Sequence, residues 1–276
     1  MPLTTSKQML LDAQRGGYAV GAFNAENMEM VQAIIAAAEE LHAPVMIQTT
    51  PGTIKYAGLD LYCANVSAAA KNASVPVAMH FDHAVQALRA GYTSIMIDGS
   101  KEVLDKNIAI TKAVVSACAP CGIPVEGELG KVGGKEDDTE SSGTGYTDPD
   151  EAVRFVAETG VFSLAVGVGT AHGVYKTKPV LNVELISTLR KVLTVPMVLH
   201  GASGLTDEAI RNCVSCGICK VNFATELRVV FSDAVKDYLK QDPGVFDPKR
   251  YGAKAREAVK RQVMERMKVC GCDGKA

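Results

Sequence analysis

The chain has 276 residues, of which 47% are hydrophobic and 22% charged, with a formal net charge of −2. This composition is ordinary for a globular protein, and the length suits one large α/β domain or two small ones. The chain has no long basic run, which argues against nucleic acid as its main partner, and no segment apolar and long enough to span a bilayer. The N-terminus does not resemble a signal peptide, so the eight cysteines predict a cytoplasmic protein with reduced thiols.

Apolar runs of strand length alternate with amphipathic helical patterns along the whole chain. The expected strands are 19–23, 44–48, 76–81, 93–97, 123–129, 162–168, 195–200 and 218–223. The expected helices include 28–41, 103–119, 148–158, 182–192 and 206–216, and Asp148 and Thr206 are predicted N-caps. Strands separated by helices imply right-handed crossovers and a parallel sheet. Eight such units predict an α/β protein with a (β/α)8 TIM barrel over residues 1–276 as a single domain; a doubly wound sheet is the alternative.

Three segments complete the predicted organisation. Residues from about 226 to 276 are charged and amphipathic, and predict extra C-terminal helices outside the barrel. The polar, glycine- and serine-rich stretch 131–147 predicts a lid or a disordered loop. Between the Asp82–His83 pair and Thr93 only residues 84–92 remain. A crossover between parallel strands needs a dozen or more residues, so we expect either a tight crossover or a missing piece of the natural chain.

Three of the five histidines stand at the ends of different predicted strands. His83 follows the third strand, His172 lies in GTAHG, and His200 ends the seventh strand. Active sites of barrels form at the carboxyl ends of the strands, and three imidazoles with one open position are a common catalytic zinc set. Asp82, beside His83, is then a candidate for proton transfer; a helix-capping aspartate is the alternative. For His80 a hydrogen-bonded place in the core is favoured.

Two later loops predict an anion site. HGASG (200–204) exposes backbone N–H groups and a hydroxyl, and VNFATE (221–226) leads from the eighth strand into a helix. Loops after the seventh and eighth strands often bind phosphate in such barrels, although ordinary turn and cap chemistry explains each loop singly. Asp98 and Glu128, at the ends of the fourth and fifth strands, are candidate metal or substrate ligands. The spacing of Cys213, Cys216 and Cys219 would suit an iron–sulfur or zinc site, but we favour cysteines buried as small apolar residues.

The motifs together resemble the class II, metal-dependent ketose-bisphosphate aldolases. The resemblance runs from about the tenth residue to the C-terminus. It rests on AFN (22–24), TTPG (49–52), HFDH (80–83), MIDGS (96–100), EGELGKVGGKEDD (126–138), GTAHGVY (169–175), LHGASG (199–204) and KVNFATEL (220–227). Within the family, TPGT, GTAHG, HGASG and NFATE look more like the tagatose-1,6-bisphosphate aldolases than the fructose-1,6-bisphosphate enzymes.

The resemblance implies one Zn²⁺ on His83, His172 and His200, with Asp98 and Glu128 as a second or alternative metal position. It implies Asp82 as the proton donor and acceptor at the C4 hydroxyl, and Glu136 in proton exchange at C3. The substrate and its phosphate would contact Asn24, Thr50, Gly173, Gly201, Ala202, Ser203, Asn222, Phe223, Ala224 and Thr225. A monovalent cation, Na⁺ or K⁺, near the phosphate loops is also a family feature.

The implied reaction is reversible aldol cleavage of a ketose 1,6-bisphosphate, tagatose favoured, to dihydroxyacetone phosphate and glyceraldehyde 3-phosphate. Fructose 1,6-bisphosphate or another phosphorylated ketose is the alternative. A non-catalytic scaffold subunit is another alternative, but it should have lost a metal ligand or the acid, and this chain keeps Asp82 and all three histidines. An amidohydrolase-like barrel should show a paired histidine on its first strand, and the segment 19–24 contains none. The family suggests a homodimer or homotetramer, and some tagatose enzymes need an accessory subunit.

Two departures from the family pattern stand out. About six residues that usually follow the Asp-His pair are missing, and the loop before Tyr146 is slightly shorter than in near relatives. We expect both segments to be mobile, with a few residues absent from this chain.

Overall fold

The computed structural model describes residues 3–82, 90–136, 139–141, 145–173, 175 and 179–276, with only the backbone described at residue 82 and over 135, 136 and 139–141. The short segment after Asp82, together with His83, lies outside the described residues, so the expectation of a missing piece there stays a prediction. The same holds for residues 142–144 before Tyr146.

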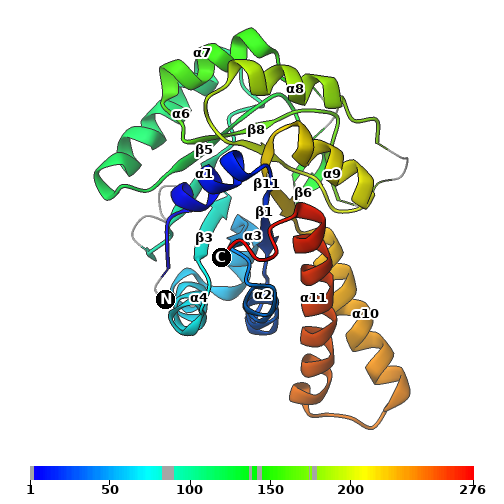
Figure 1. Cartoon of the computed structure of the whole chain (residues 1–276). Coiled ribbons are helices and arrows are strands. Elements are labelled where there is room, and N and C mark those ends of the chain that lie inside the picture. The colour runs from blue at the N-terminus through cyan, green and yellow to red at the C-terminus, as the bar shows by residue number, and fades with distance from the viewer. Residues whose placement is uncertain (1–2, 83–89, 137–138, 142–144, 174, 176–178) are drawn as a thin grey trace.

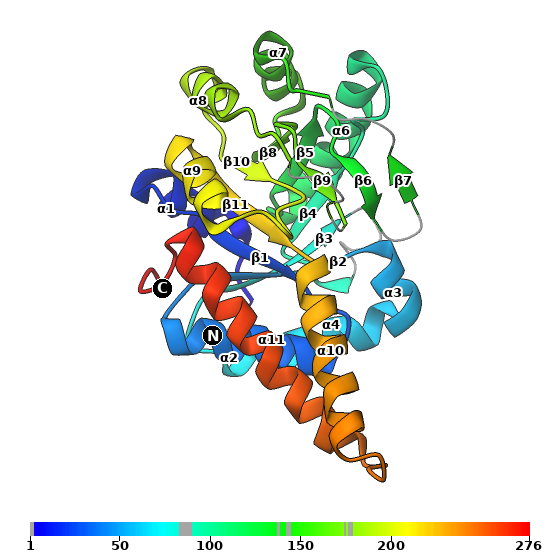
Figure 2. The same cartoon turned by 90° about the vertical axis from the view of Figure 1, so that its right-hand side faces the viewer.

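Eight parallel strands close into a barrel (Figures 1 and 2). They are β1 (Val20–Asn24), β2 (Val45–Thr49), β3 (Val77–Asp82), β4 (Ser94–Ile97), β5 (Val125–Leu129), β8 (Ser163–Val166), β10 (Met197–Leu199) and β11 (Ile218–Phe223). The first strand pairs with the last, Val20 opposite Lys220. A doubly wound sheet has two open edges, so this pairing excludes that alternative and confirms the predicted barrel.

Helices follow the strands and form the outer layer. They are α2 (Met28–Leu41), α6 (Leu104–Cys118), α7 (Pro149–Thr159), α8 (Val183–Val192) and α9 (Asp207–Cys216). The two predicted caps are present. The Asp148 side chain accepts hydrogen bonds from Asp150 and Glu151, and Thr206 accepts one from Ala209. The sequence thus located these helices to within one residue, because apolar periodicity marks all five and side-chain caps mark the start of four of them, α6 being the exception.

Three helices were not among those expected. α1 (Ser6–Gly16) lies at the amino ends of the strands, where Ser6 Oγ is 2.9 Å from Ser94 Oγ at the start of β4. α3 (Pro51–Ala57) and α4 (Leu59–Asn72) form the crossover after β2. Proline occupies the first position of α3, where its missing N–H costs no hydrogen bond. The carboxyl ends of the strands, where barrels of this kind build their active sites, are at the opposite end from α1.

The polar stretch 131–147 contains regular structure, which corrects the expectation of a loop without it. β6 (Gly133–Glu136) pairs antiparallel with β7 (Thr139–Ser141) and parallel with β9 (Ala171–His172). This small sheet stands beside the barrel's carboxyl end (Figure 2). The glycine-rich sequence concealed the pairing, because strand propensity is low for glycine and aspartate.

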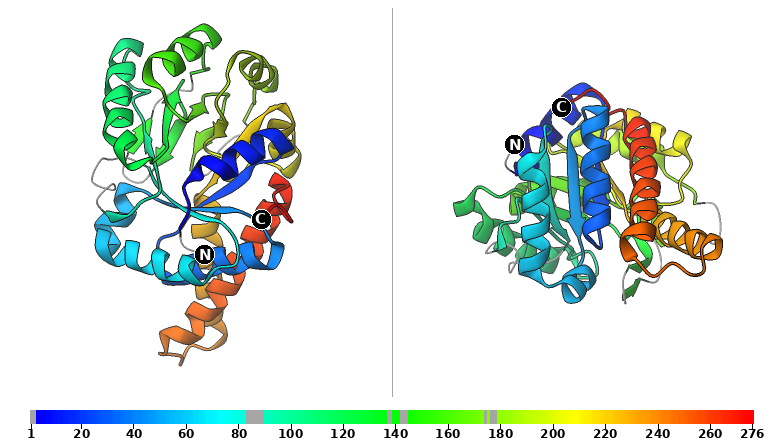
Figure 3. Two further views of the ribbon diagram at one scale, coloured as in Figure 1. Left: turned by 60° about the vertical axis from the view of Figure 1, so that its left-hand side comes forward. Right: turned by 90° about the horizontal axis from the view of Figure 1, so that it is seen from below.

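The C-terminal part of the chain confirms the extra helices. α10 (Thr225–Gln241) and α11 (Pro248–Cys270) form an antiparallel arm that projects from the barrel. α11 packs against α2 and β1, and both chain ends lie on the same side of the molecule (Figure 3). Among the residues described, no helix combines the length and the apolar character that crossing a bilayer requires.

Candidate active site at the carboxyl ends of the strands

The structure brings two of the three predicted metal-binding histidines together. The His172 and His200 rings have centroids 6.0 Å apart and planes inclined by 55°. His172 comes from β9, and His200 directly follows β10. The third predicted ligand, His83, lies outside the described residues. Its neighbour Asp82 is the last residue of β3, also at the carboxyl end of the barrel, and the structure describes its backbone alone.

Backbone contacts that only glycine permits hold His172 in place. Gly134 of β6 pairs with His172, and a Cβ atom at Gly134 would overlap the His172 carbonyl group. Gly201 adopts φ +68°, and a Cβ atom there would lie 2.6 Å from the Ala171 oxygen. Glycine is required at such positions because other residues rarely adopt positive φ and would add a methylene group. The segment carrying His172 is thus packed between the hairpin and the loop after β10.

Tyr175 joins the same two segments. Its hydroxyl group accepts a hydrogen bond from the Ala171 amide at 2.8 Å and donates one to the Gly201 carbonyl at 2.7 Å. Tyr175 lies in the GTAHGVY motif but had no predicted role. Its position, three residues beyond the predicted ligand His172, was the available signal.

His200 is buried between two carboxylates of β5. Its Nε2 atom is 2.9 Å from Glu126 Oε1, and its Nδ1 atom is 3.3 Å from Glu128 Oε2. Desolvation opposes a charge on the ring, but the hydrogen bond to Glu126 and the charges of both carboxylates raise the pKa of His200 to about 9. A cation at Nδ1 competes with a proton for that nitrogen, as it does at any histidine ligand.

Glu126 is also paired on its other side. Burial raises its pKa, but the Lys220 ammonium group and the His200 hydrogen bond outweigh burial and lower the pKa of Glu126 to about 2. Lys220 Nζ donates to Glu126 Oε2 at 2.9 Å. Neither residue was among the predicted site residues. Alternation along β5 and β11 places them on the faces that carry Glu128 and Asn222, and this was the signal that could have found them.

The donors gathered here fit a divalent transition metal such as zinc. Imidazole nitrogens and carboxylate oxygens are its usual protein ligands, and His172, His200 and Glu128 supply them. Among the described residues no three metal-ligating side chains meet at one point. His83 is the further ligand that the sequence predicts, and it lies outside the described residues. Asp98, the other predicted alternative ligand, accepts a hydrogen bond from the Ser100 amide at 2.8 Å.

The two predicted phosphate loops meet. The Ser203 hydroxyl group, in the loop after β10, accepts a hydrogen bond from the Ala224 amide at 3.1 Å. Ala224 is the N-cap of α10 and offers no side-chain cap, so the first amides of α10, from Thr225 onward, lack a side-chain acceptor at that position. An uncapped helix N-terminus attracts an anion through these amides and the helix dipole. Gly173 and Ala202 belong to the same group of loops.

Buried amides line the strands next to these loops. Asn24, at the end of β1, accepts a hydrogen bond from Gln48 Nε2 at 3.0 Å. Its own Nδ2 atom, Gln48 Oε1 and Asn222 Oδ1 are buried with no hydrogen-bond partner among the described residues. Buried polar atoms without partners are costly and rare in native proteins. Two of these three atoms belong to Asn24 and Asn222, which were predicted to contact the substrate. The unpartnered atoms therefore favour a polar ligand at this place.

Two other predicted site residues, Thr50 and Phe223, also make contacts that serve the fold. Thr50 is the N-cap of α3 and accepts a hydrogen bond from Thr53. Phe223 stacks on Phe23, with ring centroids 5.4 Å apart. Glu136 lies in β6, where only its backbone is described. His80 is fully buried and bonded to Ser94, which confirms its predicted place in the core. Cys213 and Cys219 are buried, as predicted, whereas Cys216 is half-buried.

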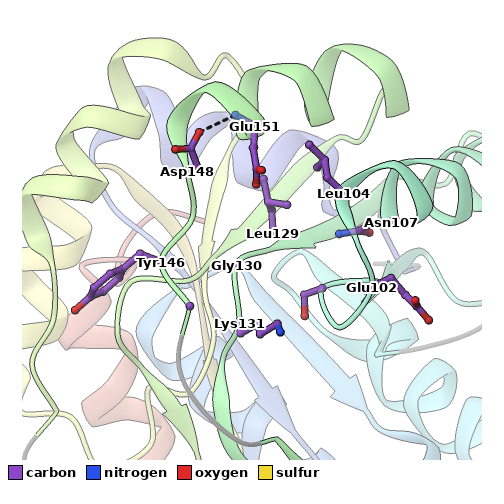
Figure 4. Close-up of a pocket in the computed structure, with 11 residues that line it drawn as sticks. Glu102, Leu104, Asn107, Leu129, Gly130, Lys131, Tyr146, Asp148 and Glu151 are labelled. Atoms are coloured by element: carbon purple, nitrogen blue, oxygen red, sulfur yellow. Dashed lines mark hydrogen bonds between the residues drawn. The ribbon is translucent and has the colours of Figure 1, made fainter.

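A separate pocket opens beside the site and contains none of the predicted site residues (Figure 4). Its volume is about 490 Å³, and it lies between the N-terminal ends of α6 and α7. Lys131 lines it together with Glu102, Asp148 and Glu151. Asp148 is already bonded to the Glu151 amide. The charges are mixed, so this pocket offers no defined preference for a ligand.

Comparison with known proteins gives a consistent result. The sequence profile described as "Fructose-bisphosphate aldolase class-II" matches residues 4–275. The crystal structure of the YdjI aldolase from Escherichia coli K12 is 36% identical, covers 99% of each chain and superposes with a TM-score of 0.87. A solved structure from Coccidioides immitis is 30% identical over 97% of this chain and 96% of its own, with a TM-score of 0.87. The fructose-bisphosphate aldolase of Campylobacter jejuni, 24% identical over 100% of this chain and 97% of its own, shares the fold with a TM-score of 0.86.

Proposed function

This chain belongs to the class II fructose-bisphosphate aldolase family and is an aldolase that cleaves a ketose bisphosphate, and we propose that its substrate is tagatose 1,6-bisphosphate. The products of this cleavage are dihydroxyacetone phosphate and glyceraldehyde 3-phosphate. The sequences TPGT, GTAHG, HGASG and NFATE, which resemble the tagatose enzymes, support this choice of substrate. Fructose 1,6-bisphosphate or another phosphorylated ketose is the alternative.

The family is generally zinc-dependent, and we assign the ion to His83, His172 and His200. The approach of the His172 and His200 rings to 6.0 Å is the observation that carries this assignment. Bound zinc supplies Lewis-acid polarisation of the substrate carbonyl group. Glu128, near His200 Nδ1, and Asp98 are proposed as an alternative metal position.

Protons are moved by carboxylates of the chain. Asp82, at the carboxyl end of β3, removes the C4 hydroxyl proton, so the C3–C4 bond breaks and the aldehyde leaves. Glu136 of β6 exchanges the proton at C3 of the product that remains. The amide group of Asn222, at the end of β11, donates a hydrogen bond to the charge that develops on the oxygens. No lysine Schiff base takes part.

Substrate binding is proposed for the loops that meet at the carboxyl ends. Gly173, Gly201 to Ser203, and Asn222 to Thr225 hold the phosphate group, since the Ser203–Ala224 hydrogen bond joins these loops and α10 begins there uncapped. Asn24 and Thr50 complete the contacts. We place a Na⁺ or K⁺ ion near the phosphate. The protein is proposed to act in the cytoplasm as a homodimer or homotetramer, with an accessory subunit in some contexts.

A coupled assay of the purified protein with tagatose and fructose 1,6-bisphosphates tests the substrate. We expect a higher kcat/KM for the tagatose sugar; a higher value for the fructose sugar overturns the proposal. Chelator-treated protein should lose activity and regain it with Zn²⁺. Asp82→Ala should still bind zinc but turn over at least about a hundredfold more slowly, because general acid–base groups contribute factors of that order. Unchanged turnover would remove Asp82 from its role.

A further inference from the structure

The barrel interior contains a lysine that the proposed reaction does not use. Lys220 lies in β11, and its side chain is 0% exposed. A buried ammonium group is unfavourable unless charged or polar partners replace water around it. Lys220 cannot act as a nucleophile on the substrate while its amine is enclosed and paired. Its role must therefore be sought in the groups that it contacts.

Lys220 reaches across the barrel. Its Nζ atom is 2.9 Å from Glu126 Oε2 on β5, although β10 and β8 separate β11 from β5 in the barrel. On the other side, Nζ lies 3.5 Å from His80 Nε2. His80 Nδ1 is 2.8 Å from Ser94 Oγ, which in turn is 2.9 Å from Ser6 Oγ. The ammonium group is thus held from both sides.

Glu126 divides its two oxygens between Lys220 and His200. Oε2 accepts from the ammonium group, and Oε1 is 2.9 Å from His200 Nε2. With Lys220 holding one oxygen, the carboxylate plane cannot rotate away from the imidazole. A carboxylate in this place accepts the Nε2 proton, so Nδ1 is left as the nitrogen with a lone pair for a metal ion.

We propose that Lys220 is a positioning residue that, through Glu126, fixes the orientation and the protonated nitrogen of His200 for metal binding. This inference rests on the proposed metal site. A purely stabilising role is a weaker explanation, because a buried ion pair contributes no more to stability than well-packed apolar side chains of similar volume. The arrangement instead gives orientation, which partners of metal ligands commonly provide.

The test is the Zn²⁺ affinity of the metal-free protein, measured by competition with a chromogenic chelator. Lys220→Met should weaken zinc binding about 10- to 100-fold, the usual effect of losing such a partner. Glu126→Gln should weaken it to a similar extent. Because Lys220 acts through Glu126, adding Lys220→Met to the Glu126→Gln variant should change the affinity less than about twofold.

Tyr92→Phe is the matched control. It removes a buried hydroxyl group that is 2.7 Å from Thr49 Oγ1 and is not part of the chain to His200. Its zinc affinity should stay within about twofold of the wild type. In the zinc-loaded wild type, ¹⁵N-histidine spectra should show a proton on His200 Nε2 that exchanges slowly. Lys220→Met should speed that exchange.

The outcomes separate the two proposals. Wild-type protein that binds no zinc overturns the metal site and this inference together. Wild-type protein that binds zinc while folded Lys220→Met binds it within twofold keeps the metal site and overturns the role of Lys220. Should Lys220→Met fail to fold, the charge-free double variant decides: an affinity further reduced about tenfold from that of Glu126→Gln means that Lys220 acts otherwise than through Glu126, and overturns the inference.

Discussion

The barrel interior and the C-terminal arm each contain a lysine–carboxylate ion pair, and the two pairs differ in their exposure to water. Lys220 and Glu126 pair inside the barrel with side chains 0% and 2% exposed, whereas Lys240 and Asp237 pair on α10 with side chains 76% and 65% exposed. Water screens the second pair and already solvates its members when they separate. Removing one member of the first pair leaves a charge that nothing solvates. Burial, more than distance, should therefore decide what each pair contributes.

Glu126→Ala should have the largest effect on stability. The replacement leaves Lys220 buried without its carboxylate and should lower the free energy of unfolding by about 3–5 kcal/mol. Urea denaturation of the metal-free protein measures this. The double variant Glu126→Leu with Lys220→Met, which carries neither charge, should recover most of the loss. A loss below about 1 kcal/mol for the single variant would break the comparison.

Glu226 sits where the arm meets the barrel and sharpens the comparison. Burial raises the pKa of Glu226 to about 7, although Arg266 lowers it, and Asp207 and Glu265 add to the increase. Glu226 Oε1 and Arg266 Nε lie 3.2 Å apart without the alignment of a hydrogen bond. The folded state therefore binds the proton more tightly than the unfolded chain does.

Protonation of Glu226 therefore stabilises the folded state at low pH. The contribution of this protonation to the free energy of unfolding is complete below pH 4.5, the ordinary pKa of a glutamate. It is lost as the pH rises to about 7, and the loss is about 3 kcal/mol at most. Glu226→Gln should flatten this part of the stability profile in urea titrations between pH 4.5 and 8. Equal slopes for the variant and the wild type would show that Glu226 does not titrate in this range.

Asp148 is exposed like the carboxylates of the arm, but its partners are backbone amides fixed in α7. It accepts hydrogen bonds from Asp150 at 2.9 Å and Glu151 at 3.0 Å. Asp148→Ala should cost about 1 kcal/mol, the usual value for an N-cap, and Asp148→Asn should cost less. Thermal unfolding of the three proteins checks this. An equal loss for Ala and Asn would assign the effect to charge and not to capping.

Lys240→Ala should have the smallest effect, about 0.5 kcal/mol or less. Its ion pair with Asp237 is exposed, and ordering the two side chains offsets the attraction. The same urea assay should show no clear shift, and added salt should not change that result. A loss comparable to that of Glu126→Ala would mean that the arm is covered in solution, for instance by a second copy.

The fold was predictable because apolar strands and capped helices repeat in a regular order. The eight expected strands correspond to the eight barrel strands, and 28–41 matches α2. The helices α3 and α4 were missed, since the segment between the second and third strands was given no structure. The hairpin of β6 and β7 was missed because its glycines and charges resemble a loop, and its pairing with β9 depends on residues distant in sequence.

The candidate site was predictable where polar residues end an apolar run, and was missed where charged residues lie within one, although residues of both kinds are buried. His200 and the loops at 200–204 and 221–226 could be predicted because polar residues stand there at the ends of apolar runs. Glu126 and Lys220 lie inside such runs, where a charge has no visible partner until the barrel closes. Their pairing spans 94 positions of sequence, so no local pattern indicates it.

The closure of the barrel has a consequence for how the chain is made. β1 obtains its second neighbour only from β11, and residues 270–276 bond back to the start of the chain, with Cys270 accepting from Ala19 and Gly274 donating to Leu41. During synthesis the first strand therefore leaves the ribosome about two hundred residues before the strand that covers its edge. An open strand edge invites wrong pairing. Until β11 has been synthesised, the edge of β1 stays exposed in the nascent protein, and protection by chaperones should matter most during this interval.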